Sequence, residues 1–283
     1  MRPSIPIAVS TGTLYPRSTL ESIRQLKELG IQDVELTLQQ SEFFLSFERK
    51  LSMPILPELS ALVQRGEVRV RSVHAPSMNS ERSGYSLRAR RQLLVHSIEV
   101  CRLLGGSLIV IHPFHLFRLY EDALDYLAGD RVLPPSALLP GMNEVLDLAH
   151  SAGIRLALEN IQDWVDELFF NTPQNVSRFL GDINHPALGF TLDVIHAEIS
   201  GFLDDFVDSM PADILNIHAS DLLPPTGRVP IGKGVIDWER LIPRLRRLPG
   251  LHQITVELGN PRIDDLSESV RFLSAAMSHK ETI

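Results

Sequence analysis

The chain has 283 residues, of which 44% are hydrophobic and 22% are charged, and its formal net charge is −8. This is an ordinary globular composition, which excludes collagen-like, coiled-coil and disordered proteins. The negative charge and the lack of a basic tract of five or more residues argue against a nucleic-acid partner, without excluding a local basic groove.

Eight short apolar segments typical of β-strands recur along the chain, and a longer helical pattern follows each of them. The expected strands are Ile5–Ser10, Asp33–Thr37, Val68–Val73, Ser107–Ile111, Ile154–Leu158, Ala187–Leu192, Asp213–Ile217 and Gln253–Val256. Most of them are almost continuously apolar, as expected of parallel strands that are buried on both faces.

The intervening segments carry helix start and stop signals. Ser18 and Glu21 have the spacing of a capping box. Thr172 precedes a proline suited to the first helical position, and Asp237 is a candidate N-cap. Glycines suited to a left-handed helix end precede five of the strands: Gly30, Gly66, Gly105, Gly153 and Gly250.

Alternation of strand and helix has two common architectures, a closed parallel barrel and an open doubly wound sheet. Eight units in 283 residues fit the barrel, and no G-x-G-x-x-G segment follows the first strand as it does in dinucleotide-binding sheets. We therefore predict an α/β fold, a single (β/α)8 TIM barrel domain over residues 1–283, with Phe114–Pro135 inserted over its mouth.

Six consecutive predicted strands end at or beside a histidine or an acidic residue. These residues are His74, His112, Glu159, Asp193, His218 and Glu257. Any one of them alone would commonly cap a helix or a carbonyl group. In a barrel, however, the carboxyl ends of all strands meet at one mouth, where catalytic groups lie. The six residues together therefore predict a functional site.

Three of these residues, Glu159, Asp193 and Glu257, would bring negative charges into one partly dry mouth. Their repulsion would raise their pKa values sharply unless a cation were present. A divalent ion removes that repulsion, and His218 supplies a fourth ligand. Three carboxylates and one imidazole favour Mn²⁺, Mg²⁺ or Co²⁺ and also admit Zn²⁺. We predict one divalent metal ion per chain.

The remaining features concern compartment and partners. The single cysteine, Cys101, excludes an internal disulfide framework and is expected to be a small buried side chain. No apolar run approaches the roughly 18 residues of a membrane span, and the N-terminal segment lacks the pattern of a signal peptide. We expect a cytoplasmic protein without a membrane partner.

The segments VHAP, IHP, ALEN, GFTLDVIHA, NIHASD and IGKGVIDW resemble those of the xylose isomerase-like barrel superfamily. This superfamily includes endonuclease IV, ketose 3-epimerases, inosose dehydratases and hydroxypyruvate isomerases. The resemblance extends from the first strand to the eighth. It is fairly specific to the superfamily and poorly specific to one activity.

One short segment separates the branches. Endonuclease IV carries an Asp-x-His zinc pair before its I-G-x-G turn, where this chain has Thr226 and Arg228. The segment from Arg228 instead resembles the R-V-P-G-K-G segment of ketose 3-epimerases, with Ile231 as an extra residue. The resemblance implies that Arg228 contacts substrate and that no third metal is bound. The metal ligands that it implies are Glu159, Asp193, His218 and Glu257.

Epimerising or isomerising a sugar requires removal of a proton next to a carbonyl group, and a metal stabilises the enediolate that develops. One carboxylate must take the proton and one must return it. Glu159 and Glu257 are the catalytic candidates, although their double duty as ligands and proton carriers is implied by the resemblance alone. The expected substrate-binding residues are His74, His112, His196 and Arg228.

These residues predict a metal-dependent isomerase or epimerase whose partner is a small sugar or polyol. The alternatives are an inosose- or shikimate-type dehydratase on the same site, an endonuclease IV-like enzyme and a non-catalytic binding protein. His196 could instead orient its neighbours, and Arg228 could lie on a surface loop. Roles for His115, Glu35, Asp221, Trp164 and Phe114 stay open between structure and function, and specificity is expected from Gln39–Met53 and Phe114–Pro135. The sugar and the oligomeric state are not predicted.

Overall fold

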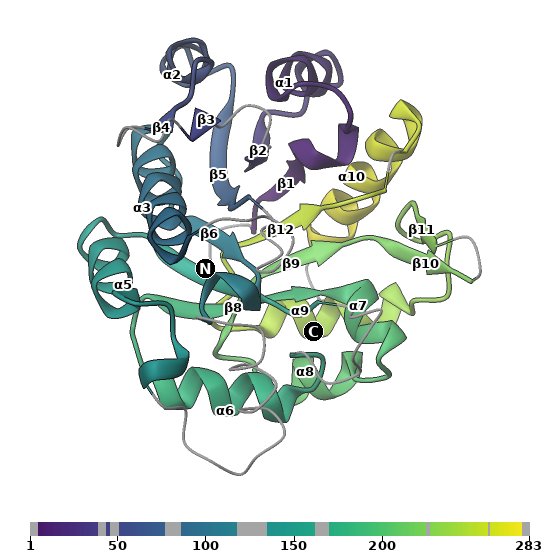
Figure 1. Cartoon of the computed structure of the whole chain (residues 1–283). Coiled ribbons are helices and arrows are strands. Elements are labelled where there is room, and N and C mark those ends of the chain that lie inside the picture. Colours follow the sequence, from purple (N-terminus) through teal and green to yellow (C-terminus); the bar gives the residue numbers. More distant parts are fainter. Residues whose placement is uncertain are drawn as a thin grey trace.

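The computed structural model describes residues 5–38, 44–45, 51–76, 86–117, 135–161, 170–224, 227–259 and 261–278. Parallel strands close into an eight-stranded barrel in the order β1-β12-β9-β8-β7-β6-β5-β2 (Figure 1). These strands are β1 (Ile7–Ser10), β2 (Asp33–Thr37), β5 (Arg69–His74), β6 (Leu108–Ile111), β7 (Arg155–Glu159), β8 (Leu188–Asp193), β9 (Ile214–Ala219) and β12 (Gln253–Val256). Each expected strand is therefore present, and its ends lie within two residues of the expected bounds.

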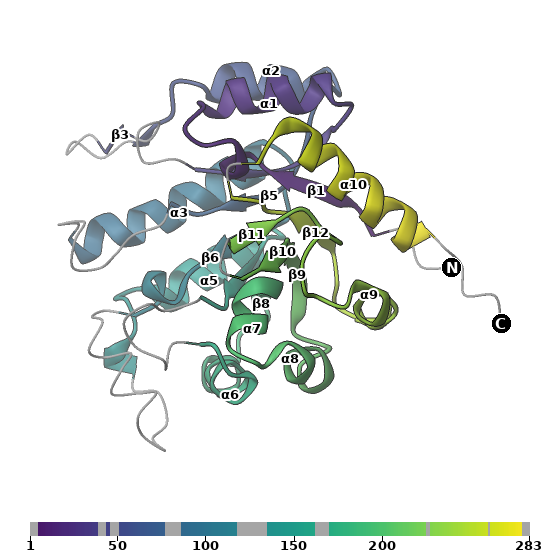
Figure 2. The ribbon, with the colours of Figure 1, turned by 90° about the vertical axis from the view of Figure 1, so that its right-hand side faces the viewer.

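Helices surround the barrel as an outer layer, which is clearest when Figures 1 and 2 are compared. They are α1 (Thr19–Glu28), α2 (Leu56–Gln64), α3 (Leu87–Leu103), α5 (Met142–Ser151), α6 (Pro173–Ile183), α7 (Val194–Ile199), α8 (Leu203–Ser209), α9 (Trp238–Arg247) and α10 (Ile263–Ser278). None of the described helices combines the length and apolarity that a membrane crossing requires. The predicted (β/α)8 architecture is confirmed.

Helix boundaries follow the expected local signals. Ser18 and Glu21 form the capping box of α1, and Thr172 and Asp237 cap α6 and α9 through their side chains. Four of the five glycines adopt positive φ, but the prediction for Gly250 is wrong. A Cβ atom at Gly250 would lie 2.7 Å from the carbonyl oxygen of Ala212, so a close backbone approach explains this glycine.

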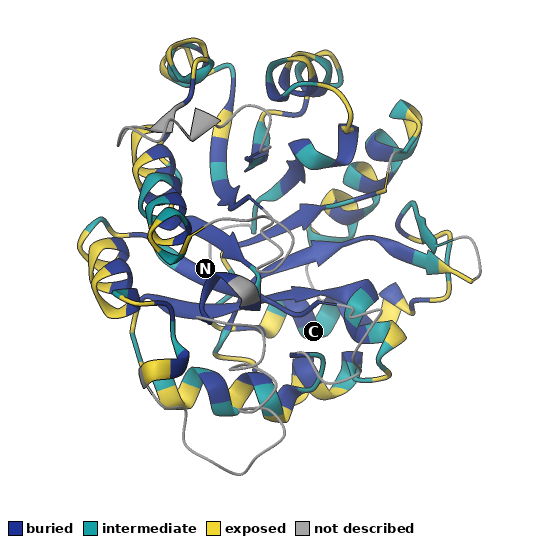
Figure 3. Cartoon of the chain, in the orientation of Figure 1, coloured by how far each residue is buried: buried dark blue, intermediate teal, exposed yellow. Residues whose placement is uncertain are grey.

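The core lies between the barrel and the inward faces of the helices. Figure 3 shows the barrel strands mostly dark blue, which marks buried residues, while the helices carry both buried and exposed residues. Burying apolar side chains of both layers stabilises the fold at roughly 25 cal/mol per Å² removed from water. Cys101 on α3 is fully buried in this core, as expected.

Two antiparallel hairpins add to the barrel. One pairs β3 (Phe44–Leu45) with β4 (Leu51–Ser52), and the other pairs β10 (Asp221–Leu223) with β11 (Gly227–Val229) directly after β9. Most of the expected insertion Phe114–Pro135 lies outside the described residues. Its described ends are the short 3₁₀ helices η3 (Pro113–His115) and η4 (Pro135–Ala137).

Candidate metal centre and active site

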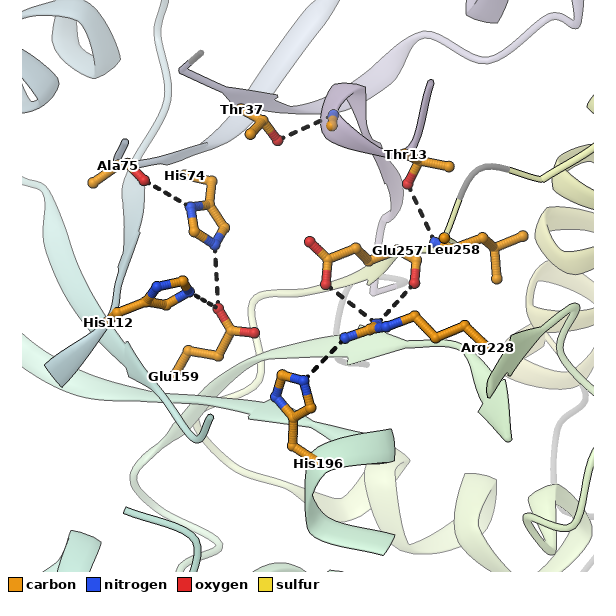
Figure 4. A pocket seen from close by; sticks show the side chains of 12 residues that line it. Thr13, Thr37, His74, Ala75, His112, Glu159, His196, Arg228, Glu257 and Leu258 are labelled. Carbon is orange, nitrogen blue, oxygen red and sulfur yellow. Dashed lines mark hydrogen bonds and ion pairs between the residues drawn. The ribbon is translucent and has the colours of Figure 1, made fainter. Parts of the chain in front are cut away.

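A cavity of about 390 Å³ lies at the carboxyl ends of the barrel strands. Figure 4 shows how side chains from different strands and loops point into it. Its lining residues are Gly12, Thr13, Thr37, His74, Ala75, His112, Glu159, His196, Arg228, Glu257, Leu258 and Gly259. The volume is in the range of small-molecule sites, and the lining is rich in groups that donate or accept hydrogen bonds.

The four expected metal ligands, Glu159, Asp193, His218 and Glu257, come together at this mouth. Each offers one ligand atom, and these four atoms all lie within 4.8 Å of one another. His218 Nδ1 is 3.1 Å from Glu159 Oε1 and 3.3 Å from Glu257 Oε2. Three carboxylates and one imidazole at this spacing fit a divalent cation.

A second group of ligand atoms shares Glu159 with the first. His74, His112 and Glu159 also place their ligand atoms within 4.8 Å of one another. Both imidazole Nε2 atoms lie 3.2 Å from Glu159 Oε2, and Figure 4 marks the two contacts with dashed lines. The other oxygen of this carboxylate faces His218. Glu159 therefore connects the two groups, one through each oxygen.

Asp193 is held rigidly at the start of α7. Its Oδ1 accepts from the backbone N–H of His196, as an N-cap does. Asn160 brackets the same residue, because its side chain accepts from the Asp193 N–H at 2.7 Å and donates to the Asp193 carbonyl at 3.0 Å. Of the two carboxylate oxygens of Asp193, this leaves Oδ2 to face the guanidinium group of Arg228.

Arg228 on β11 reaches across the mouth to two of the expected metal ligands. Its Nη2 donates to Asp193 Oδ2 at 2.8 Å, and its Nη1 lies 3.4 Å from Glu257 Oε2. It also donates to the backbone oxygen of Glu257 and to the Ser220 hydroxyl. These carboxylates raise the pKa of Arg228 although burial alone would lower it. Arg228 is therefore built into the site.

His196 is positioned from both sides of its ring. Its Nδ1–H donates to the backbone oxygen of Asn160 at 2.8 Å, which leaves a lone pair on Nε2. Arg228 Nη2 lies 3.2 Å from that Nε2 atom (Figure 4). The ring lines the cavity and contacts the guanidinium group of Arg228. The two expected roles of His196, contact with substrate and orientation of neighbours, are therefore compatible.

Charge coupling among these groups is strong. Burial by itself would raise the pKa of Glu159, but the imidazoles of His218, His112 and His74 hold it well below its usual range. Burial would lower the pKa of His74, but Glu159 and more distant carboxylates raise it to about 9. The pKa of His218 is likewise raised well above its usual value, and that of Glu257 is lowered. The imidazoles of His218, His112 and His74 thus favour the ionised form of Glu159, and His218 and Arg228 favour that of Glu257.

The roles of Asp221, His115 and Glu35 were open, and the structure shows different surroundings for each of them. Asp221 accepts from the backbone N–H groups of Leu222, Gly232 and Ile236 and from the indole of Trp238, so it organises a loop.

His115 is also structural. Its Nδ1 accepts from the His112 N–H, and its Nε2–H donates to the carbonyl of Pro76. Burial lowers the pKa of His115 to about 3, so its ring is neutral. Glu35, in contrast, contacts His218 directly.

Some predictions lie outside the described residues. These are Thr226, Trp164, the Phe114 side chain and most of the two expected specificity segments, Gln39–Met53 and Phe114–Pro135. Conversely, the structure adds Asn160, which follows Glu159 in the sequence and fixes Asp193, and the cavity-lining Thr13 and Thr37. Position beside a strand-end glutamate was the signal for Asn160.

Comparison with known proteins agrees with this architecture. A family model described as xylose isomerase-like TIM barrel matches residues 23–276. An uncharacterised protein of Methanocaldococcus jannaschii, MJ1311, is 23% identical in an alignment of 290 residues that covers 97% of this chain and 92% of that protein.

Solved structures with the same fold include a D-tagatose 3-epimerase-like protein, with a TM-score of 0.72, 20% identity and coverage of 96% of this chain and 97% of that one. The IOLI protein with a bound zinc atom has a TM-score of 0.69 and 16% identity, covering 99% and 100% of the two chains. D-allulose 3-epimerase from Methylomonas sp. in complex with D-allulose has a TM-score of 0.70 and 17% identity, covering 97% and 98%.

Proposed function

The chain belongs to the xylose isomerase-like TIM barrel family, and from this premise we propose that it is a divalent-metal-dependent isomerase or epimerase of a sugar or polyol, built as a single barrel domain over residues 1–283. The observation that carries the proposal is the group of Glu159, Asp193, His218 and Glu257, of which Glu159 and Glu257 line the cavity at the barrel mouth. Similar folds belong to a D-tagatose 3-epimerase-like protein and to D-allulose 3-epimerase.

The same four residues would hold the metal, for which Mn²⁺, Mg²⁺, Co²⁺ and Zn²⁺ are the candidates. A similar fold, that of the IOLI protein, binds a zinc atom. A divalent ion in this place would polarise a substrate carbonyl group and stabilise negative charge on its oxygen.

The protein's own groups would move the proton. Glu159 and Glu257 both reach His218 Nδ1, yet they enter from β7 and from the end of β12. Two carboxylates on separate strands can face a planar intermediate from different sides, so one removes the proton and the other returns it. His74, His112, His196 and Arg228 line the cavity and would hydrogen-bond the substrate oxygens, which fixes the carbon that loses its proton.

Charge favours a neutral substrate. Four carboxylates, those of Glu35, Glu159, Asp193 and Glu257, surround His218 and Arg228. One divalent ion and Arg228 compensate three of these four negative charges when the imidazoles are neutral. Arg228 is the only arginine or lysine among the described lining residues. A phosphate group would add about −2 more, whereas an uncharged ketose or polyol adds none.

The test is deuterium exchange combined with a metal count. The purified protein is incubated with a panel of ketoses and polyols in D₂O, and the bound metal is quantified by elemental analysis. We expect about one ion per chain and deuterium at the carbon next to the carbonyl group. Glu257→Gln should abolish the exchange, whereas Glu144→Gln on the outer helix α5 should not. Absence of exchange with every metal-loaded mixture would contradict the proposal.

The second ligand group, His74, His112 and Glu159, favours one alternative. An endonuclease IV-like enzyme would need two further ions, one at this group and one where Arg228 now lies. Three ions per chain and cleavage of abasic DNA would support it. A dehydratase would use the first group, and its product would be lighter than the substrate by one water molecule.

A further inference from the structure

We propose that Glu35 is a positioning residue that holds the His218 ring so that Nδ1 faces Glu159 and Glu257. The inference rests on the proposed function in one respect, namely that the Nδ1 side is where a metal ion binds. Glu35 lies in the middle of β2 and His218 in β9, and both side chains are completely buried. The two strands are three positions apart in the barrel order, so the side chains meet across the barrel interior.

The contact between the two residues is direct. His218 Nε2 lies 3.1 Å from Glu35 Oε1 and 3.4 Å from Glu35 Oε2, to which it donates. The opposite ring nitrogen, Nδ1, lies 3.1 Å from Glu159 Oε1 and 3.3 Å from Glu257 Oε2. The ring thus joins Glu35 on one side to the expected metal ligands on the other.

Two further residues hold the carboxylate of Glu35 in place. The Gln253 amide nitrogen can only donate, and it does so to Ser72 Oγ at 2.7 Å. The Ser72 hydroxyl therefore uses its one proton toward Glu35 Oε2, at 2.8 Å. Glu35 Oε1 has no hydrogen-bond partner of good geometry within the described residues, and His218 Nε2 is 3.1 Å away. A buried carboxylate in this setting requires a proton on Nε2.

The proton on Nε2 decides which nitrogen can bind a metal. A neutral imidazole has one N–H group and one lone pair, so an Nε2–H group given to Glu35 leaves the lone pair on Nδ1. That lone pair points toward Glu159 and Glu257. Carboxylates that accept from the far nitrogen of a ligating histidine both fix its tautomer and orient its ring. Glu35 would act in this way without touching the metal or the substrate.

The experiment measures Zn²⁺ affinity by chelator competition and the His218 ring signals by ¹⁵N NMR, in the full-length protein. Glu35→Met removes the acceptor at similar volume, and we expect an affinity about 10- to 100-fold lower. Glu35→Gln keeps an amide oxygen that accepts from Nε2–H, so the loss should be smaller. Ser97→Ala is the control for loss of a buried hydroxyl, because Ser97 is fully buried in α3 and donates to the backbone oxygen of Leu93, outside this hydrogen-bond network.

In the zinc-loaded wild type we expect Nε2 of His218 to carry a slowly exchanging proton and Nδ1 to carry the metal. Glu35→Met should lose that proton signal. If Glu35→Met does not fold, Ser72→Ala releases the carboxylate instead and should show a smaller loss of affinity in the same direction. Wild-type affinity together with an unchanged Nε2–H signal in the foldable variant would overturn the inference.

Failure of the proposed function gives a different result. A wild type that binds no divalent metal contradicts the metal-dependent activity. The Glu35 inference is then decided in the metal-free protein, where a protected Nε2–H signal that vanishes in Glu35→Met supports it and an unaffected signal refutes it.

Discussion

Replacing Asp193 by asparagine should separate metal binding from folding. Asparagine caps helices about as well as aspartate, so its side-chain oxygen can keep the bond from the His196 N–H that begins α7. The amide nitrogen then takes the place of Oδ2 and faces Arg228 Nη2, which now lies 2.8 Å away, donor against donor. Losing a hydrogen bond between charged groups costs about 1.5–3 kcal/mol.

This loss has two measurable consequences. In the metal-free protein the Tm should fall by about 3–12 °C, at about 2–4 °C per kcal/mol for a chain of this size. Metal affinity should fall by about 10- to 150-fold if the lost carboxylate contact with the ion has a similar magnitude. Calorimetric titration with Mn²⁺, Co²⁺ and Zn²⁺ measures the second effect, and a thermal scan in the presence of a chelator measures the first.

Asp33→Asn is the matched control. Asp33 is the first residue of β2, away from the mouth, and accepts from the guanidinium groups of Arg69 and Arg71, so an amide group would weaken these ion pairs. It contacts none of the four expected ligands in the described structure, so Asp33→Asn should lower Tm and leave metal affinity unchanged. Equal metal affinities for the wild type and Asp193→Asn would remove Asp193 from the ligand set and refute the reasoning.

Three other predictions use the same site and its surroundings. Arg228→Met should keep the metal content while kcat/KM for the identified substrate falls by about 1.5–3 kcal/mol, or about 10- to 150-fold; unaltered turnover would speak against substrate contact. The pKa of His74 is raised from 6.5 to about 9 in the folded metal-free protein, so its stabilisation is complete below pH 6.5 and is lost as the pH rises through 9. Tm should therefore decline between pH 7 and 9.5 less steeply in His74→Asn than in the wild type, and parallel profiles would contradict this. Burial raises the pKa of Cys101 to about 12, so iodoacetamide at pH 8 should label it only after denaturation, and equal labelling rates before and after would disprove its burial.

The barrel could be predicted because each strand is an apolar run with a helix signal after it. Strand-end residues such as Glu159 and His218 could also be placed at one mouth, since parallel strands put their carboxyl ends at the same edge. The roles of the side chains within that mouth were less accessible. Which carboxylate oxygen faces which imidazole depends on strand register and tilt, and hydropathy patterns contain neither.

Glu35 shows a signal that was present in the sequence and undervalued. It is a charged residue between the apolar Val34 and Leu36 of β2, and it lies in register with Ser10 and Ser72 of the neighbouring strands. Because side chains alternate along a strand, Glu35 and its apolar neighbours must point to opposite faces. A buried charge of this kind needs a partner, so its position alone indicated a hydrogen-bonded group inside the barrel.

Arg228 could not have been located in the same way. It is 35 residues from Asp193, and its hairpin leaves β9 at the mouth and must turn back over it. Asp221 accepts from the backbone of Gly232 and Ile236, so a carboxylate that could have been catalytic instead ties down the segment after the arginine. The guanidinium group then meets Asp193 and Glu257. The segment from Arg228 thus identifies this arginine in the sequence. Its position among the expected metal ligands depends on the tethered hairpin.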